Sequence, residues 1–90
     1  MEFEWDTKKA AANVRKHKVA FQEAATVFGD SLAVTFEDPD HSKNESRHIT
    51  FGLSVHGRPF VVSHAERGDR TRIISARLMD RTERGIYEEG

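Results

Sequence analysis

The fold of this chain is decided by residues 47–77, RHITFGLSVHGRPFVVSHAERGDRTRIISAR. Apolar and polar residues alternate here in three runs, 47–55, 59–67 and 70–77, and such alternation is typical of half-buried β-strands. The runs are separated by the short turn sequences HGRP and Gly68-Asp69. Because short turns join antiparallel neighbours, we expect two consecutive hairpins.

Helices and further strands are predicted on both sides of these hairpins. Asp6 is a suitable N-cap for the first helix, and Asp80 with Glu83, three residues later, forms a capping box for the last one. The expected elements are a strand at 3–5, helices at 7–17 and 18–30, a strand at 31–37, an acidic loop at 37–46 and a final helix at 80–89.

This order, β-α-α-β-β-β-β-α, predicts an α+β fold in a single domain, 1–90. We expect an antiparallel sheet with the two N-terminal helices on one face and a C-terminal helix. The chain has no cysteine, which excludes disulfides and thiolate metal sites, and no apolar run approaches the roughly 18 residues of a membrane span. A cytoplasmic location is the default expectation.

Charge is distributed unevenly along the chain. The net charge is −1, which argues against nucleic-acid binding over the whole surface. Residues 47–77, however, hold six arginines against two acidic residues, whereas 31–46 and 78–90 are acidic. A local basic patch of this kind can attract phosphate.

The turn lengths decide which face each side chain occupies. Two-residue turns at His56-Gly57 and Gly68-Asp69 pair Leu53 with Phe60 and Arg67 with Arg70. A three-residue loop at either turn would flip part of the assignment. On this register one face, buried under the first two helices, holds Ile49, Phe51, Leu53, Val55, Phe60, Val62 and Ile73, with His64, Glu66, Ser75 and Arg77 toward its margins. The other face holds His48, Thr50, Ser54, Ser63, Arg67, Arg70 and Arg72.

Arg67, Arg70 and Arg72 would then be close neighbours. Like charges opposed across strands are destabilising, and a phosphate would relieve the repulsion because the guanidinium fork donates two hydrogen bonds. The alternative is a solvated edge, neutralised by acidic neighbours such as Glu66 or Asp69. Spacing alone favours the edge.

Other candidates have similar alternatives. His48 could serve the arginine face as a general acid or base, but strand histidines are more often merely exposed. His64 is expected at the margin of the core, and Glu66 could simply pair with Arg47. The single tryptophan, Trp5, could stack on a base, although core packing is the commoner role. The five histidines are scattered and predict no metal site.

Four stretches of the chain resemble the BrnT family of toxins from type II toxin–antitoxin pairs, over about residues 3–89. They are FEWDTKKAAANVRKHKVAFQEAATVF, LAVTFEDPDHS, AERGDRTRIISAR and the closing E-x-x-x-Y. The resemblance implies a RelE-like fold, ribonuclease toxicity and a BrnA antitoxin in a complex with two copies of each chain, which contacts operator DNA through the antitoxin. The matching motif positions are Trp5, Asp6, Lys9, Asn13, Lys16, His17, Glu66, Arg67, Arg72, Ser75, Arg77, Glu83 and Tyr87.

Two positions depart from the family pattern. Lys18 stands where the family usually has a glycine suited to a left-handed helix end, at a cost of about 1 kcal/mol if that conformation is kept. Ala20 replaces a common serine and forgoes a helix cap worth about 1 kcal/mol.

The expected function is a metal-independent endoribonuclease, without a cofactor, that cleaves messenger RNA and inhibits translation. The alternative is a non-catalytic module that binds the antitoxin and acts as a co-repressor. The residues predicted to take part in catalysis are Arg67, Arg72, Glu66, His64 and Lys9. Those predicted to contact RNA are Arg70, Arg77, His48, Lys16 and Trp5.

Overall fold

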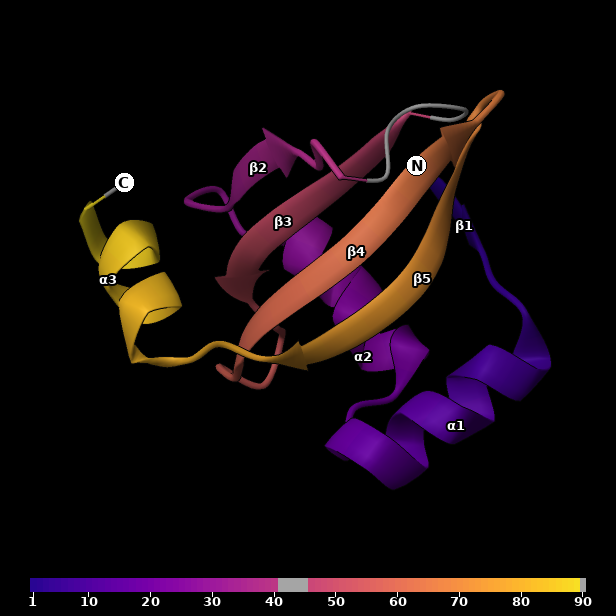
Figure 1. The fold of residues 1–90 in the computed structure, drawn as a ribbon, viewed down its shortest axis with the longest axis horizontal. Helices are drawn as coiled ribbons and strands as arrows, with labels where there is room; N and C mark the ends of the chain where they lie inside the picture. The colour runs from indigo at the N-terminus through magenta and orange to yellow at the C-terminus, as the bar shows by residue number, and fades with distance from the viewer. Residues whose placement is uncertain (41–45, 90) are drawn as a thin grey trace.

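A computed structural model gives the arrangement of residues 1–40 and 46–89. Part of the predicted acidic loop, residues 41–45, lies outside the described residues. The elements, shown in Figure 1, are β1 (Glu2–Glu4), α1 (Thr7–His17), α2 (Phe21–Ala25) continued by a 3-10 turn (Thr26–Gly29), β2 (Val34–Glu37), β3 (Arg47–Leu53), β4 (Pro59–Arg67), β5 (Arg70–Leu78) and α3 (Arg81–Glu89).

The second helix is shorter than the predicted span of 18–30. Lys18 adopts a left-handed conformation, with φ of 60°, and its N–H closes the end of α1 on the Val14 carbonyl. Ala20 is extended and offers no side-chain cap, so α2 begins only at Phe21. The two departures noted in the sequence therefore lie at the junction between the helices.

The five strands form one sheet in the order β1-β5-β4-β3-β2. β2 to β5 are antiparallel, as predicted, but β1 lies parallel to β5, so the sheet is mixed. The prediction of a wholly antiparallel sheet is wrong because short turns reveal only neighbours that follow each other along the chain. β1 and β5, by contrast, are far apart in the sequence: Glu2 pairs with Arg70.

The turn between β3 and β4 is one residue longer than predicted. Ser54 accepts from the Gly57 N–H at 2.8 Å and donates its own N–H to Arg58 at 2.9 Å, which leaves three residues in the loop. Gly57 has φ of +76°, a conformation that favours glycine. The pairing is therefore Gly52 with Phe60 and Thr50 with Val62, one residue away from the predicted register.

This shift exchanges the two faces of β3. Ile49 and Phe51 lie on the face opposite to Phe60 and Val62, whereas His48 and Thr50 join Val62 on the helix side. The predicted burial of Leu53 and Val55 is also wrong: Leu53 is partly exposed and Val55 is 71% exposed in the loop.

The main core lies between the sheet and α2, with Phe21 and Phe60 fully buried. Burial of one such ring contributes roughly 2–3 kcal/mol. Gly52 permits close packing here, since a Cβ at this position would lie 2.7 Å from Val27 Cγ1 of the 3-10 turn. The buried members of this core are Val19, Phe21, Ala24, Val27, Phe60, Val62, Ile73 and Ala76.

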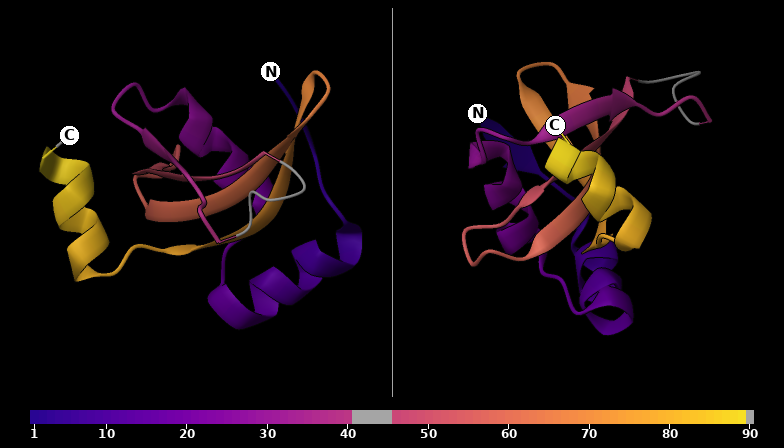
Figure 2. Two further views of the ribbon diagram at one scale, coloured as in Figure 1. Left: turned by 45° about the horizontal axis from the view of Figure 1, so that its top comes forward. Right: turned by 90° about the vertical axis from the view of Figure 1, so that its left-hand side faces the viewer.

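The opposite face of the sheet carries a smaller core under α3. It consists of Phe51, Val61 and Met79, with Ile49 and Tyr87 packed against them. Tyr87 also donates a hydrogen bond to Asp30 at 2.7 Å, and this contact raises the pKa of the phenol to about 12. Figure 2 shows α3 at the end of the molecule remote from α1.

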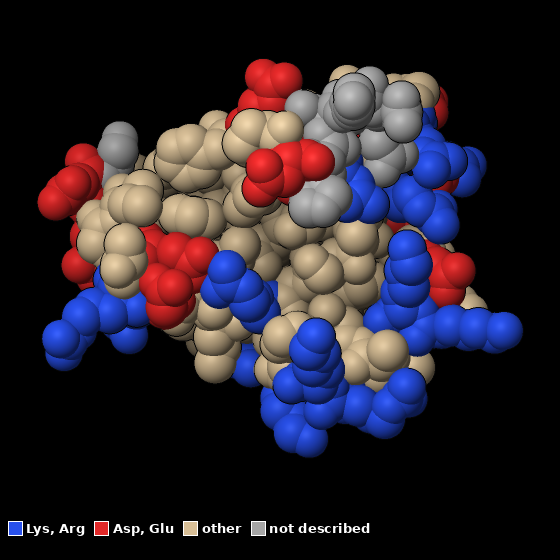
Figure 3. All heavy atoms as spheres, viewed as in Figure 1, with Lys and Arg blue, Asp and Glu red and all other residues tan. Residues whose placement is uncertain are grey.

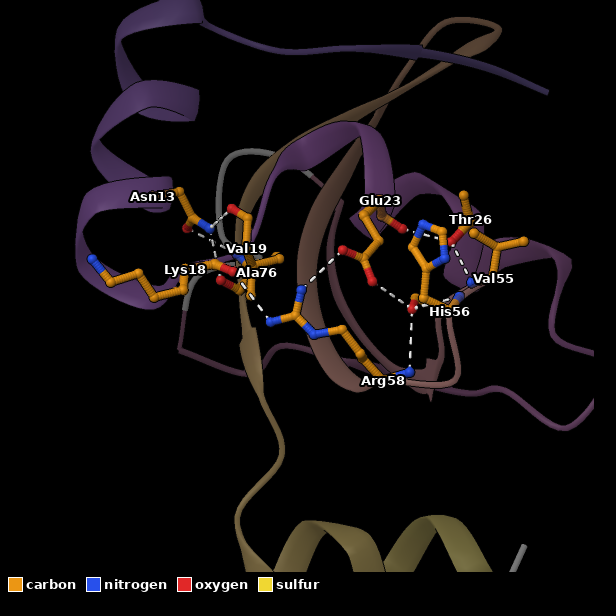
Figure 4. Close-up of polar contacts among 10 residues, drawn as sticks. Asn13, Lys18, Val19, Glu23, Thr26, Val55, His56, Arg58 and Ala76 are labelled. Carbon is orange, nitrogen blue, oxygen red and sulfur yellow. Dashed lines mark hydrogen bonds and ion pairs between the residues drawn. The ribbon is translucent and has the colours of Figure 1, made fainter.

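α1 lies along β5 at the edge of the sheet rather than squarely on a face (Figure 1). The buried side chain of Asn13 donates to the carbonyls of Val19 and Ala76 and accepts from the Ala76 N–H (Figure 4). The pairing of β1 with β5 ends at Arg72. Asn13 thus continues the hydrogen bonding of β5 where β1 has ended.

A second polar network ties the α1–α2 connection to the β3–β4 turn (Figure 4). Arg58 donates to Glu23 at 2.9 Å and to the Lys18 carbonyl at 3.1 Å, and its guanidinium lies over the Phe60 ring. Glu23 in turn accepts from the Ser54 hydroxyl at 2.7 Å. This arginine therefore has a structural role and lies away from the hairpin that carries Arg67.

Candidate nucleic-acid interface

The β4–β5 hairpin carries the arginines on one face, as the sequence predicts. Arg67 lies opposite Arg70 and Ala65 opposite Arg72, which is the register expected for a two-residue turn. Gly68 in that turn has φ of +64°. Because side chains alternate along a strand, the three arginines point away from His64 and the main core.

Figure 3 views this face directly. Lys and Arg side chains gather along its right and lower right margins, over the hairpin and α1. On the left, around α3, acidic and basic side chains lie side by side. The largest concentration of cations on this face is therefore at the hairpin and α1, although the net charge of the protein is −1.

Arg77 shares the arginine face, contrary to the expected register, because of a bulge in β5. His64 pairs with Ile73 but Ser63 pairs with Ser75, which leaves Ile74 as an extra residue and reverses the alternation beyond it. Ser75 and Arg77 therefore lie opposite Ser63 and Val61 and not on the side of Ile73.

The guanidinium of Arg77 is held by α3. It donates to both carboxylate oxygens of Glu83, at 2.8 and 2.7 Å, and this contact lowers the pKa of Glu83. Glu83 also completes the predicted capping box with Asp80. Arg77 is thus an attachment point for α3, some distance along β5 from the hairpin tip.

Two carboxylates of β1 lie beside the arginines, and sequence reasoning missed both. Glu4 accepts from Arg72 at 3.0 Å and lies 3.8 Å from Arg70, whose guanidinium is 3.9 Å from Glu2. Alternation in the EFEW segment does place these glutamates on the side opposite Phe3. The parallel pairing with β5, which brings them to the arginines, left no local signal in the sequence.

The start of α1 adds another cation to this region. Asp6 accepts from the N–H groups of Lys8 and Lys9, which lower its pKa, and the charges of Lys9 and Arg72 lower it further. Asp6 therefore lies within electrostatic range of both Lys9 and Arg72. Lys16 is exposed in the last turn of the same helix.

His64 is a buried core residue, 4% exposed, on the other side of the sheet. Its Nε2 forms a 2.7 Å hydrogen bond with the Thr50 hydroxyl, and its ring packs edge-on against Phe28. Burial, together with the nearby His48, lowers the His64 pKa to about 4. The ring is therefore neutral at pH 7 and has little access to a large substrate.

His48 and Glu66 lie on the same face of the sheet as His64, opposite to the arginines. The His48 ring stacks on His64 with centroids 5.8 Å apart, which corrects its predicted place on the arginine face. Glu66 is about half exposed near the hairpin tip, accepts from the Thr71 hydroxyl and lies 3.9 Å from His64 Nδ1. Arg47 pairs in register with Ala65 rather than with Glu66.

Trp5 is half-buried and packs edge-on against Phe21, with centroids 6.0 Å apart. It belongs to the edge of the main core, which is the commoner role considered for a single tryptophan. Within residues 1–40 and 46–89, no three His, Asp or Glu side chains gather as a metal site requires. Over the same residues, no helix has the length and apolar composition needed to cross a membrane.

Comparison with known proteins places this chain in a class of ribonuclease toxins. Residues 5–83 match the family described as "Ribonuclease toxin, BrnT, of type II toxin-antitoxin system". The chain belongs to the BrnT family. Membership of a type II toxin–antitoxin system implies an antitoxin partner.

The fold is similar to a solved structure, the 1.1 Å crystal structure of the Brucella abortus ribonuclease toxin BrnT. The TM-score is 0.71, with 21% sequence identity over 90% of this chain and 99% of that chain. At this identity the likeness supports the α+β fold. No curated protein gives a significant match to the sequence.

Proposed function

We propose that this protein is an endoribonuclease that cleaves messenger RNA and so inhibits translation, with the arginine face of the β4–β5 hairpin as its phosphate-binding surface. The observation that carries the proposal is the common orientation of Arg67, Arg70 and Arg72. Lys9 and Arg72 both lie within electrostatic range of Asp6. Lys9 therefore extends this surface to the start of α1. The cytoplasm, where messenger RNA is translated, is the proposed place of action.

The proposed reaction is attack of an RNA 2′-hydroxyl on the adjacent phosphate, which forms a 2′,3′-cyclic phosphate as the bond to the 5′-oxygen of the next nucleotide breaks. The 2′-hydroxyl loses its proton, and the leaving 5′-oxygen gains one. Negative charge develops on the phosphate oxygens in the transition state, where fixed cationic donors stabilise it more than in the ground state. Arg67 and Arg72 are assigned this role, with Lys9 and Arg70 assisting. Because guanidinium groups supply the positive charge, the mechanism needs no metal ion.

The candidates for proton transfer are Glu66, His48 and His64, and their placement restricts that role. All three lie on the side of the sheet opposite the arginines. Glu66 is the most exposed and lies one residue from Arg67 near the hairpin tip. Proton transfer by Glu66 therefore requires the RNA to pass around the tip. His64, whose Nδ1 is 3.9 Å from Glu66, would act through Glu66, and His48 only through its stacking on His64.

We further propose a RelE-like architecture and a BrnA-type antitoxin, in a complex of two toxin and two antitoxin chains that contacts operator DNA only through the antitoxin. Family membership supports the partner class. An acidic antitoxin segment would complement the cationic margin in Figure 3 and exclude RNA from it.

Incubation of the purified, antitoxin-free protein with single-stranded RNA tests the proposed activity. Cleavage that persists in the presence of a chelator supports the metal-independent ribonuclease. Cleavage abolished by the chelator would contradict metal independence. No cleavage by well-folded protein would instead favour a non-catalytic antitoxin-binding module.

A further inference from the structure

Glu4 lies between two of the arginines assigned to phosphate binding. One carboxylate oxygen is 3.0 Å from Arg72 Nη1 and the other is 3.8 Å from Arg70 Nη1. The side chains of Glu4 and Arg72 are 26% and 30% exposed, so the contact is partly shielded from water. A single carboxylate thus links two arginines that would otherwise repel each other.

The backbone around Glu4 is fixed from both sides. Phe3 packs against Phe28 with ring centroids 5.3 Å apart, and Trp5 packs against Phe21. Between these two anchors, parallel pairing places Glu4 beside Arg72. The carboxylate is therefore held in place by the core, although β1 is only three residues long.

A partly exposed ion pair contributes little to stability, so stability alone does not account for this arrangement. Arginine loses considerable rotamer freedom when its fork is fixed, and a carboxylate that fixes the fork in advance removes this loss from the reaction. The Glu4 contact engages Nη1 of Arg72, and a guanidinium has five N–H donors, so one carboxylate does not exhaust its capacity.

We propose that Glu4 is a positioning residue that orients Arg72, and through its second oxygen Arg70, for the scissile phosphate. The inference rests on the proposed ribonuclease function. Glu4 carries a negative charge next to the RNA, so it opposes binding of the substrate while it favours the reactive geometry. Removal of its charge should therefore separate affinity from rate.

The test compares Glu4→Gln with Glu2→Gln as the matched control. Glu2 is on the same strand and face, but it is 70% exposed and its contact with Arg70 is 3.9 Å long. Glu4→Gln should slow RNA cleavage by about 10-fold or more, since small misplacements of catalytic groups are costly. Affinity for a 2′-O-methyl RNA oligonucleotide, which lacks the nucleophile, should be unchanged or tighter. Glu2→Gln should cleave at nearly the wild-type rate.

The melting temperatures of both variants should stay close to the wild-type value. Cleavage by Glu4→Gln at the wild-type rate would overturn the proposal. A parallel loss of cleavage, affinity and melting temperature would also overturn it, because that pattern indicates a structural role.

A spectroscopic measurement keeps this inference separate from the ribonuclease proposal. The Arg72 Nε–Hε resonance, assigned with Arg72→Lys, should shift and broaden in Glu4→Gln and stay unchanged in Glu2→Gln. An unchanged Arg72 resonance in Glu4→Gln would exclude positioning even if the wild-type protein cleaves RNA. If the wild-type protein cleaves no RNA, the ribonuclease proposal and the catalytic role of Glu4 fail together, whereas a shifted resonance would still establish the orientation of Arg72.

Discussion

Asn13 binds the backbone of Ala76, a residue 63 positions away, through both its amide nitrogen and its amide oxygen. The same nitrogen also donates to the Val19 carbonyl at 2.9 Å. One buried side chain therefore joins α1, the helix connection and the edge of β5. This arrangement explains a buried polar residue in a helix whose other positions are mostly exposed.

Asn13→Ala should destabilise the fold by about 2–4 kcal/mol, because it leaves three buried backbone groups without their partner. For a domain of this size each kcal/mol lowers the melting temperature by about 4–8 °C. Thermal or urea unfolding measures the loss. Lys16→Ala, an exposed change on the same helix, serves as the control and should stay within about 0.5 kcal/mol of wild type. A cost below about 1 kcal/mol for Asn13→Ala would show that the hydrogen bonds are dispensable.

Arg67→Ala and Arg72→Ala should each reduce RNA cleavage by about 100-fold, comparable to the loss of one transition-state donor. Arg72→Lys should fall in between, because lysine keeps the charge but not the fork. Growth arrest in cells and cleavage of RNA in vitro both report the effect. Arg81→Ala on α3, at the other end of the molecule, should remain toxic. Full growth arrest by both hairpin variants would rule out the assigned roles.

His64 should make the protein less stable as the pH falls from about 6.5 to about 4. The pKa of its imidazole is about 4 in the folded protein, against an ordinary value of 6.5 for an unfolded chain. Within this window the unfolded chain therefore binds a proton that the folded protein rejects. The total loss in the free energy of unfolding is up to about 3 kcal/mol. No loss occurs above the pKa that the imidazole has in the unfolded chain. Urea unfolding at a series of pH values measures it.

His64→Gln provides the comparison for this pH dependence, because glutamine does not titrate. Its stability should vary much less between about pH 6.5 and about pH 4.5. Three carboxyl groups have pKa values below their ordinary values of 3.8–4.5: Asp6, Asp30 and Glu83. Their protonation lowers the stability of the fold only at pH values below this window. Equal pH dependence in the variant and the wild type would mean that another group is responsible.

Lys18→Gly should stabilise the protein by about 1 kcal/mol, since Lys18 has φ of 60° and glycine adopts this conformation without a steric penalty. The contact from Arg58 is to the Lys18 carbonyl and is kept by the variant. Chemical unfolding measures the gain. Lys16→Gly, in a helical conformation on α1, should instead lose about 1 kcal/mol. Destabilisation by Lys18→Gly would indicate that the lysine side chain has a role of its own.

The parts of the fold that the sequence predicted correctly are those with local chemical signals. Asp6 and Asp80 cap their helices as expected. Either hairpin turn could have held two or three residues. The turn at Gly68-Asp69 holds two, with Gly68 at a positive φ, and so gives the predicted arginine register. The HGRP turn holds three, and this one residue moves His48 to the other face.

What the sequence could not predict depends on contacts between distant segments. The parallel pairing of β1 with β5 brings Glu4 to Arg72, and no local pattern specifies it. The bulge at Ile74, which moves Arg77 to the arginine face, is equally invisible because Ile74 itself fits a regular strand. The cations of the candidate site were thus predictable, but their counter-charges, Glu2 and Glu4, were not.

The parallel β1 strand also has a practical consequence for experiments on this protein. Glu2 pairs in register with Arg70, so a fusion partner joined ahead of Met1 would emerge beside the arginine face. An acidic tag at that end would compete with RNA for the arginines and so mimic neutralisation of the toxin by an antitoxin. The C-terminal end of α3 lies at the far side of the molecule (Figure 1), and it is the better place for affinity tags or fluorophores.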